Sequence, residues 1–139
     1  MNKEFTIGSH SVGNNAPVFI VAEMSANHLQ DYGRAVEIIH AAKEAGADAV
    51  KLQTYRPETI TLDSEASCFQ ITQGTIWDGT TLYKLYEEAY TPWDWQPKLV
   101  EEANRLRMEC FSSPFDFTAV DFMESMNMPA YKLASYEIN

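Results

Sequence analysis

The sequence predicts a parallel α/β fold, and three observations lead to this class. Short apolar segments alternate with segments whose apolar residues recur at helical spacing. The segment "VFIVAEMSA" at 18–26 is apolar on both faces apart from Glu23, as in a parallel strand covered on both sides. Polar residues gather where each apolar segment ends, and parallel α/β proteins build ligand sites at the carboxyl ends of their strands.

The N-terminal segment and the first helix have clear boundary signals. The sequence "EFTIGSHSVGNNAP" at 4–17 alternates and then breaks at a run of Gly, Asn and Pro, which predicts a short hairpin. We therefore expect a hairpin or cap at residues 1–16 and the main domain at residues 17–139. A helix is expected from Asp31, as its N-cap, to Gly46, because apolar residues recur at helical spacing between them.

The same alternation continues along the rest of the sequence. A second helix is expected over 91–107, with Thr91 as its N-cap and Pro92 at the first helical position. A third helix is expected over 116–127, with Asp116 as its N-cap. The remaining parallel strands, which bring the expected total to four, are "AVKLQTY" (49–55), "ECFSSPF" (109–115) and "AYKLASYEI" (130–138).

One connection is longer than this pattern needs. Residues Arg56 to Tyr90 separate the second strand from its helix, and a loop of that length in a compact domain is usually functional. Part of the loop, "TLYKLYEEAY" at 81–90, is expected to be helical, and the loop also carries Trp77. We interpret the segment as an insertion that faces a substrate, and a purely structural decoration is the alternative.

Charge and composition exclude several classes of function. Ten basic against twenty acidic residues give a net charge of −10, which repels nucleic acid and anionic membrane surfaces. The two cysteines, Cys68 and Cys110, lack metal-ligand spacing, so we expect reduced and packed thiols. Motifs for dinucleotides and nucleoside triphosphates are absent, and no apolar run suggests export or a membrane span. A cytoplasmic protein without nucleic-acid or membrane partners is expected.

Two lysines stand in segments that otherwise have the composition of buried strands. A buried ammonium group needs a fixed negative partner, so Lys51 and Lys132 in an acidic chain predict a site for an anionic ligand. Lys51 and Gln53 alternate with apolar neighbours and share one face of their strand, and Tyr55 follows on the same side. We therefore expect these three side chains to face a common site.

On the fourth strand the spacing leaves a question open. Strict alternation puts Lys132 on one face and both Ser135 and Glu137 on the other. All three converge only if the strand bends or ends near Ala134.

The sequence offers further interpretations for the other polar residues at the strand ends. Ser112 and Ser113, before Pro114, are either donors to a phosphate or turn residues that precede a helix. Glu23 is either packed, paired with a strand lysine, or a general acid or base. His28, next to Asn27, is expected to bond the backbone as an ordinary loop histidine.

Four ordered motifs give the sequence a family resemblance. "FIVAEMSANH", "GADAVKLQTY", "FSSPFD" and "PAYKLASYEI" closely resemble the N-terminal half of the sialic acid synthase family, which condenses phosphoenolpyruvate with an N-acetylated amino sugar. The resemblance covers nearly everything from Pro17 onward. Sialic acid synthases usually have glycine where this chain has Ser25 with Ala26 and Leu29 with Gln30. These departures, together with the segment at 69–99, resemble the pseudaminic acid synthase branch.

The resemblance implies the N-terminal half of a (β/α)₈ TIM barrel over residues 17–139. The second half of the barrel and a small antifreeze-like C-terminal domain, which caps the partner's site in homodimers of the family, are expected outside this sequence. The implied metal is a divalent manganese or magnesium ion, held by two histidines that also lie beyond Asn139. His10, His28 and His40 are therefore not expected to bind metal.

The resemblance also implies roles for individual residues. Lys51, Ser113, Lys132 and Ser135 would hold the phosphate and carboxylate of phosphoenolpyruvate. Glu23 and Glu137 would be catalytic, and which of them moves the proton is open. Residues expected to contact the sugar are Gln53, Asn27, Tyr55 and Trp77.

Three alternatives remain at this stage. The sugar is either a 2,4-diacetamido-2,4,6-trideoxy-altrose, which gives pseudaminic acid, or N-acetylmannosamine, which gives N-acetylneuraminate. A different barrel enzyme, an aldolase with Lys51 or Lys132 as a Schiff base, would leave the other lysine without a role. The chain by itself is alternatively an inactive fragment with only binding capacity, because its four strand–helix units are half of the eight in a barrel.

Overall fold

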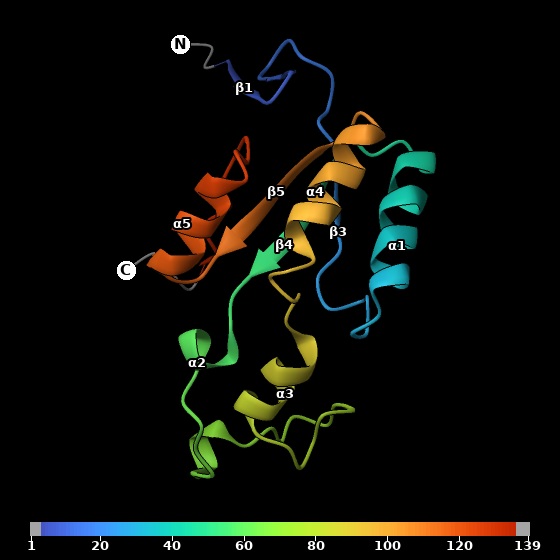
Figure 1. Cartoon of the computed structure of the whole chain (residues 1–139). Helices are drawn as coiled ribbons and strands as arrows, with labels where there is room; N and C mark the ends of the chain where they lie inside the picture. Colours follow the sequence, from blue (N-terminus) through green and yellow to red (C-terminus); the bar gives the residue numbers. More distant parts are fainter. Residues whose placement is uncertain (1–3, 136–139) are drawn as a thin grey trace.

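The computed structural model describes residues 4–135 and confirms the parallel α/β class. Three parallel strands lie side by side in the order β3 (Val21–Glu23), β4 (Ala49–Thr54) and β5 (Glu109–Pro114). Figure 1 shows the N-terminal hairpin at one end of this sheet and the long insertion at the other, beyond the strand arrowheads. The candidate site residues therefore lie at the end of the sheet that carries the insertion.

Three helices cover one face of the sheet (Figure 1): α1 (Tyr32–Glu44), α4 (Gln96–Arg105) and α5 (Phe117–Ser125). Val50, Leu52 and Cys110 of the strands are buried with residues of these helices in one apolar cluster. Each fully buried aliphatic side chain contributes about 1.5–3 kcal/mol to folding. Residues contributed by the helices include Ile39, Leu99 and Met123.

Two helices begin where the sequence predicts. Asp31 Oδ1 accepts a hydrogen bond from the Arg34 backbone N–H at 3.0 Å, which satisfies a free donor of the first turn of α1. Asp116 Oδ1 does the same for α5, because it accepts from the backbone N–H of both Thr118 and Ala119. Gly46, with φ +87°, follows the end of α1 in the left-handed region that glycine adopts without strain.

The predicted start of α4 is wrong. The helix begins at Gln96 rather than Pro92, and Thr91 is not its N-cap. The Thr91 hydroxyl instead lies 3.1 Å from the His28 ring, so it is not available to the first helical turn. A single turn precedes the helix, in which the Trp95 N–H donates to the Pro92 carbonyl.

The N-terminal hairpin is confirmed and covers the amino end of the sheet. It pairs β1 (Phe5–Ile7) with β2 (His10–Val12) in antiparallel register. Gly8 at its tip has φ +56°, and a Cβ there would lie 2.1 Å from the Glu109 carboxyl carbon. Ser9 donates to Glu109 Oε1 from both its backbone N–H and its hydroxyl, at 2.8 and 2.9 Å. The expected domain boundary at residue 16 stays a prediction.

The long connection has structure of its own. It contains α2 (Pro57–Ile60), a short 3₁₀ helix at Ser67–Phe69 and α3 (Leu82–Ala89), so the helix expected at 81–90 is confirmed. Asp78 accepts from the backbone N–H groups of Gly74 and Thr75, both at 2.9 Å, and these bonds lower its pKa. The connection is therefore a folded insertion.

Two expected strands are shorter than the sequence suggests. The strand expected at 18–26 is limited to β3. Before it, the Ile20 N–H donates to Asp48 Oδ2 at 2.8 Å instead of to a neighbouring strand, and after it, Ser25 has φ +50°, which ends the extended conformation. The fourth, expected at 130–138, is represented within the described residues by one parallel bridge between Ser112 and Tyr131. Residues 136–138 of that expected strand lie outside the described range.

Candidate functional site

Polar side chains share the face of the sheet opposite to the helices. Glu23 pairs with Lys51 across β3 and β4, and Gln53 pairs with Ser113 across β4 and β5. Partners in a parallel sheet project to the same side, and residues two apart along a strand do so as well. The alternate residues Val50 and Leu52 belong to the helix-side core, so Lys51 and Gln53 face the other way.

Lys51 and Glu23 form an ion pair on this face. The Lys51 Nζ lies 2.8 Å from Glu23 Oε2. The Lys51 side chain is 7% exposed, whereas that of Glu23 is 58% exposed. A buried cation needs a negative partner, and the exposed Glu23 carboxylate supplies one that a bound anion would join or replace.

Gln53 and Ser113 stand next to this pair on the same face. Ser25, in the loop after β3, donates to Gln53 Oε1 at 3.5 Å. Ser113 is buried, at 2% exposure, and it is the register partner of Gln53. The turn reading of Ser112 and Ser113 is not supported, since both lie within β5.

Tyr131 indicates the side of the sheet on which Lys132 lies, because the two residues are adjacent. Tyr131 bridges Ser112 in parallel register, and its hydroxyl donates to Glu124 on α5, which raises the pKa of Tyr131 to about 12. Tyr131 therefore lies on the helix side. Lys132, the next residue, follows on the side of Ser113, and its backbone N–H donates to the Ser112 carbonyl at 3.0 Å.

The site residues expected near the C-terminal end are either exposed or outside the described residues. Lys132 and Ser135 are exposed, unlike the buried Lys51. Glu137 lies outside the described residues. The assignment of Lys132 and Ser135 to phosphoenolpyruvate, and of Glu137 to catalysis, stays a prediction.

The residues expected to contact a sugar do not all meet. Asn27 lies in the loop after β3, where its side-chain amide donates to the Met24 carbonyl at 2.9 Å. Tyr55 is 3% exposed, and its ring makes edge contacts with Tyr86 and Phe115, so burial raises its pKa. Trp77 lines a cavity of about 280 Å³ within the insertion. Their roles toward a sugar stay predictions.

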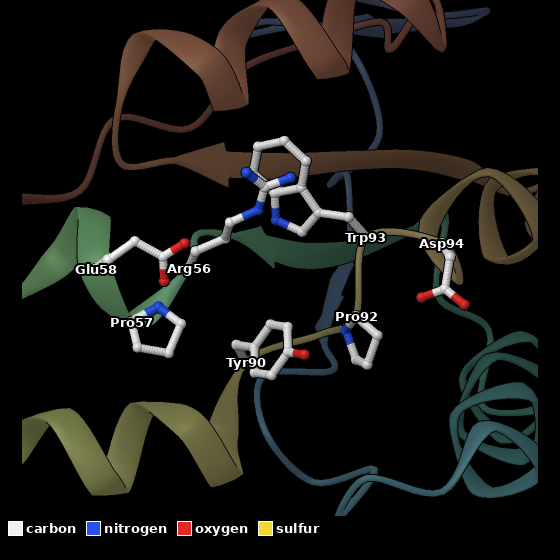
Figure 2. Close-up of a pocket in the computed structure, with 7 residues that line it drawn as sticks. All are labelled: Arg56, Pro57, Glu58, Tyr90, Pro92, Trp93 and Asp94. Carbon is white, nitrogen blue, oxygen red and sulfur yellow. The ribbon is translucent and has the colours of Figure 1, made fainter.

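Sequence reasoning missed a further cavity, of about 250 Å³, just beyond the end of β4. Figure 2 shows the Arg56 guanidinium over the Trp93 ring, and the guanidinium carbon lies 4.0 Å from the ring centroid. The opposite contact of Trp93 is a stack with Phe122 of α5, with centroids 4.6 Å apart. The cavity adds a fixed cation near the strand ends, and the position of Arg56 directly after a strand was the available signal. It is also lined by Glu58, Tyr90 and Asp94.

A buried polar group lies on the helix side of the strand ends. The Thr54 hydroxyl donates to Gln96 Oε1 at 2.8 Å and lies 2.7 Å from the Ser112 hydroxyl. The Gln96 amide in turn donates to the Thr91 carbonyl at 3.3 Å. These bonds fasten α4 to β4 and β5 directly behind the candidate site.

The histidines and cysteines of the described residues form no metal centre. Within residues 4–135, no group of three or more His, Cys, Asp or Glu side chains is placed to hold a metal ion. His40 of α1 bonds Glu102 of α4 at 2.6 Å. Cys110 is buried, which raises its pKa to about 12, but Cys68 is exposed, so the expectation of packed thiols is wrong for Cys68.

A parallel sheet with helices on one face and polar residues on the other, near the strand ends, is an arrangement found in (β/α)-barrel proteins. A model of the NeuB family matches residues 38–139, and the chain belongs to the NeuB family. A pseudaminic acid synthase of Helicobacter pylori is 53% identical over 122 residues, which are 88% of this chain and 36% of that protein. A pseudaminic acid synthase of Campylobacter jejuni is 48% identical over 122 residues, which are 88% of this chain and 35% of that protein.

A solved structure agrees with this assignment. The N-acetylneuraminic acid synthetase of Leptospira borgpetersenii superposes with a TM-score of 0.81 at 28% identity, over 99% of this chain and 43% of that one. The expected fold, the N-terminal half of a (β/α)₈ barrel, is thereby confirmed. The chain spans little more than a third of the curated relatives described above, 36% and 35% of their lengths. None of the helices within residues 4–135 combines the length and the hydrophobicity that a membrane span requires.

Proposed function

We propose that the full-length protein, meaning the whole polypeptide in which this sequence occurs, is a pseudaminic acid synthase. It condenses phosphoenolpyruvate with 2,4-diacetamido-2,4,6-trideoxy-altrose and releases phosphate. The observation that carries the proposal is the buried Lys51 ammonium, 2.8 Å from Glu23, on the face of the sheet opposite to the helices. The relatives named above, at 53% and 48% identity, support the choice of product.

The proposed chemistry suits these residue types. The methylene carbon of phosphoenolpyruvate joins the sugar aldehyde, water adds at the enol carbon, and phosphate leaves by cleavage of its C–O bond. Lys51 and Lys132 would neutralise the phosphate and carboxylate and stabilise the departing charge. Buried Ser113 would donate to the phosphate, and Glu23 or Glu137 would transfer the proton to or from water or the new hydroxyl.

A Schiff-base aldolase fits the observed geometry less well. Such an enzyme needs one uncharged, nucleophilic lysine in a dry pocket. Lys51 instead has a carboxylate at 2.8 Å, and Lys132 is exposed. Treatment with borohydride and a keto substrate separates the two mechanisms, because the proposed synthase gives no covalent adduct.

The divalent cation and the homodimer are proposals that rest on the family resemblance. The described residues offer no cluster of three ligands, so they do not fit a manganese or magnesium ion by themselves. The ligands would have to come from another part of the full-length protein. A cytoplasmic location belongs to the same set of proposals.

Product analysis tests the proposed function. Full-length protein is incubated with phosphoenolpyruvate, manganese and the diacetamido sugar, and the mixture is analysed by mass spectrometry and by an assay for phosphate. We expect one equivalent of phosphate for each molecule of pseudaminic acid. Phosphate release without a condensed product would contradict the proposal.

A further inference from the structure

The loop after β3 has an unusual backbone conformation. Ser25, Leu29 and Gln30 have φ values of +50°, +49° and +56°, in the left-handed region that side chains other than glycine rarely adopt. Three such residues in a short loop persist only where surrounding contacts determine the conformation. Asn27, a residue expected to contact the sugar, stands in the middle of this loop.

His28 makes some of the contacts that hold the conformation of this loop. Its side chain is completely buried and contacts the Trp95 ring edge to face, with centroids 5.7 Å apart. The Gln30 backbone N–H donates to His28 Nδ1 at 3.1 Å, so Nδ1 carries no proton. The proton of the neutral ring is therefore on Nε2, which donates to the Thr91 hydroxyl at 3.1 Å.

The same loop is bonded to the end of the insertion. The Gln30 side-chain amide donates to the Tyr90 carbonyl at 2.5 Å and to the Glu88 carbonyl at 3.2 Å. Thr91 directly follows Tyr90 and is 1% exposed. The bond from His28 to Thr91 thus joins the loop that carries Asn27 to the point where the insertion returns to the sheet.

The hydrogen bonds continue into the strands. Gln96 donates to the Thr91 carbonyl, and its Oε1 accepts from Thr54, so the Thr54 hydroxyl in turn accepts from Ser112. The donor of each hydrogen bond is thus assigned. This buried chain of hydrogen bonds ends at Ser112, next to Ser113. These hydrogen bonds connect the end of the insertion to β4 and β5, the strands that carry the candidate site.

We propose that His28 and Thr91 form a positioning pair that sets the insertion and the Asn27 loop for binding of the amino sugar. The inference rests on the proposed function, because it concerns the sugar half of that reaction. Both residues are buried, so we expect neither to touch a substrate. Lys51 is attached to the sheet by its own strand, so use of phosphoenolpyruvate is not expected to depend on the pair.

Kinetics of full-length variants test the pair. Thr91→Val removes the hydroxyl at nearly constant volume, Thr91→Ser keeps it, and His28→Gln keeps a donor without the Nδ1 acceptor. We expect Thr91→Val to raise the KM for the sugar about tenfold or more, with kcat within about threefold and the KM for phosphoenolpyruvate within about twofold. Thr91→Ser and the control His40→Gln, a histidine bonded to Glu102 on the outer helices, should remain near wild type.

A double-variant cycle tests the coupling itself. If His28 and Thr91 act as one unit, the double variant of His28→Gln with Thr91→Val loses about as much as the worse single variant rather than the product of both. Independent, multiplicative losses would overturn the pair. Equal increases in the KM values for sugar and phosphoenolpyruvate would also overturn it, because they indicate a general structural defect.

Amide hydrogen exchange separates this inference from the proposed function. Thr91→Val should speed exchange in the segments 28–31 and 88–91 and leave exchange in β4 unchanged, whatever the substrate. Unchanged exchange in both segments would overturn the proposal that His28 and Thr91 hold these segments together. If wild-type protein turns over no sugar, the proposed function fails, and the exchange result still decides whether the pair holds the two segments.

Discussion

Lys51 and Glu23 are register partners on adjacent parallel strands, and their side chains form an ion pair of 2.8 Å. The two groups are therefore held by the sheet and not by a loop, so their separation is fixed by backbone hydrogen bonds. Lys51 is buried and Glu23 is exposed. The Glu23 carboxylate can therefore turn toward water or a ligand while the Lys51 ammonium stays in place. This asymmetry motivates the first two predictions.

Loss of either strand lysine should weaken the use of phosphoenolpyruvate. Lys51→Ala in the full-length protein should cost about 2–5 kcal/mol of the transition-state stabilisation in kcat/KM for phosphoenolpyruvate, the scale for removing one partner of a buried charge pair. Lys132→Ala should cost less, because Lys132 is exposed. Steady-state kinetics measure this, with exposed Lys43→Ala as the control, and ordinary kinetics for Lys51→Ala would exclude the phosphate assignment.

Glu23→Gln keeps the shape of the side chain and removes its charge. We expect the variant to fold and to bind phosphoenolpyruvate but to lose most of its turnover, because the amide cannot transfer a proton. Binding is measured by calorimetry and turnover by phosphate release. A turnover within about threefold of wild type, less than 1 kcal/mol of transition-state stabilisation, would make Glu23 a structural partner of Lys51.

Thr54→Val tests the buried polar group behind the site. The change removes a hydroxyl that contacts Gln96 and Ser112 and leaves both without this partner. We expect the free energy of unfolding to fall by about 1–3 kcal/mol, measured by urea denaturation. Thr6→Val, on the exposed hairpin, should change it by less than about 0.5 kcal/mol. A Thr54→Val protein as stable as the Thr6→Val protein would contradict the importance of the group.

The buried His28 predicts a loss of stability in acid. Burial lowers its pKa below the ordinary 6.5, so the unfolded chain binds this proton at a higher pH than the folded protein does. The free energy of unfolding should therefore decline as the pH falls below about 6.5 and stop declining below the folded pKa. His28→Gln should show a shallower decline between about pH 7.5 and pH 5.5 in urea denaturation. An unchanged slope would mean that His28 does not contribute to the acid sensitivity.

The sequence predicts the helices well where a local side chain caps them. Asp31 and Asp116 both accept the expected backbone donors, because capping depends on residues only a few positions away. The start of α4 was predicted wrongly for a tertiary reason. Thr91 and Pro92 have the composition of a helix start, but the Thr91 hydroxyl is engaged by His28, a residue distant in sequence.

The candidate site shows the same division between local and long-range information. The shared face of Lys51 and Gln53 follows from alternation along one strand, and the register with Glu23 and Ser113 agrees with it. Alternation left open whether Lys132 converges with Ser135 and Glu137, and it does not say which face of a strand meets the helices. The contact of Tyr131 with Glu124 indicates the side of Lys132 only. The Arg56 cavity depends on the stacking of Trp93 with Phe122, which no local pattern reveals.

The most direct test of the proposed function compares two sugars with the same full-length protein. Initial rates of phosphate release from phosphoenolpyruvate are measured with 2,4-diacetamido-2,4,6-trideoxy-altrose and with N-acetylmannosamine, and the specificity constants are compared. The account predicts a preference of about tenfold or more for the diacetamido sugar, about 1.4 kcal/mol in transition-state binding. A preference for N-acetylmannosamine would contradict it and would identify the protein as an N-acetylneuraminate synthase.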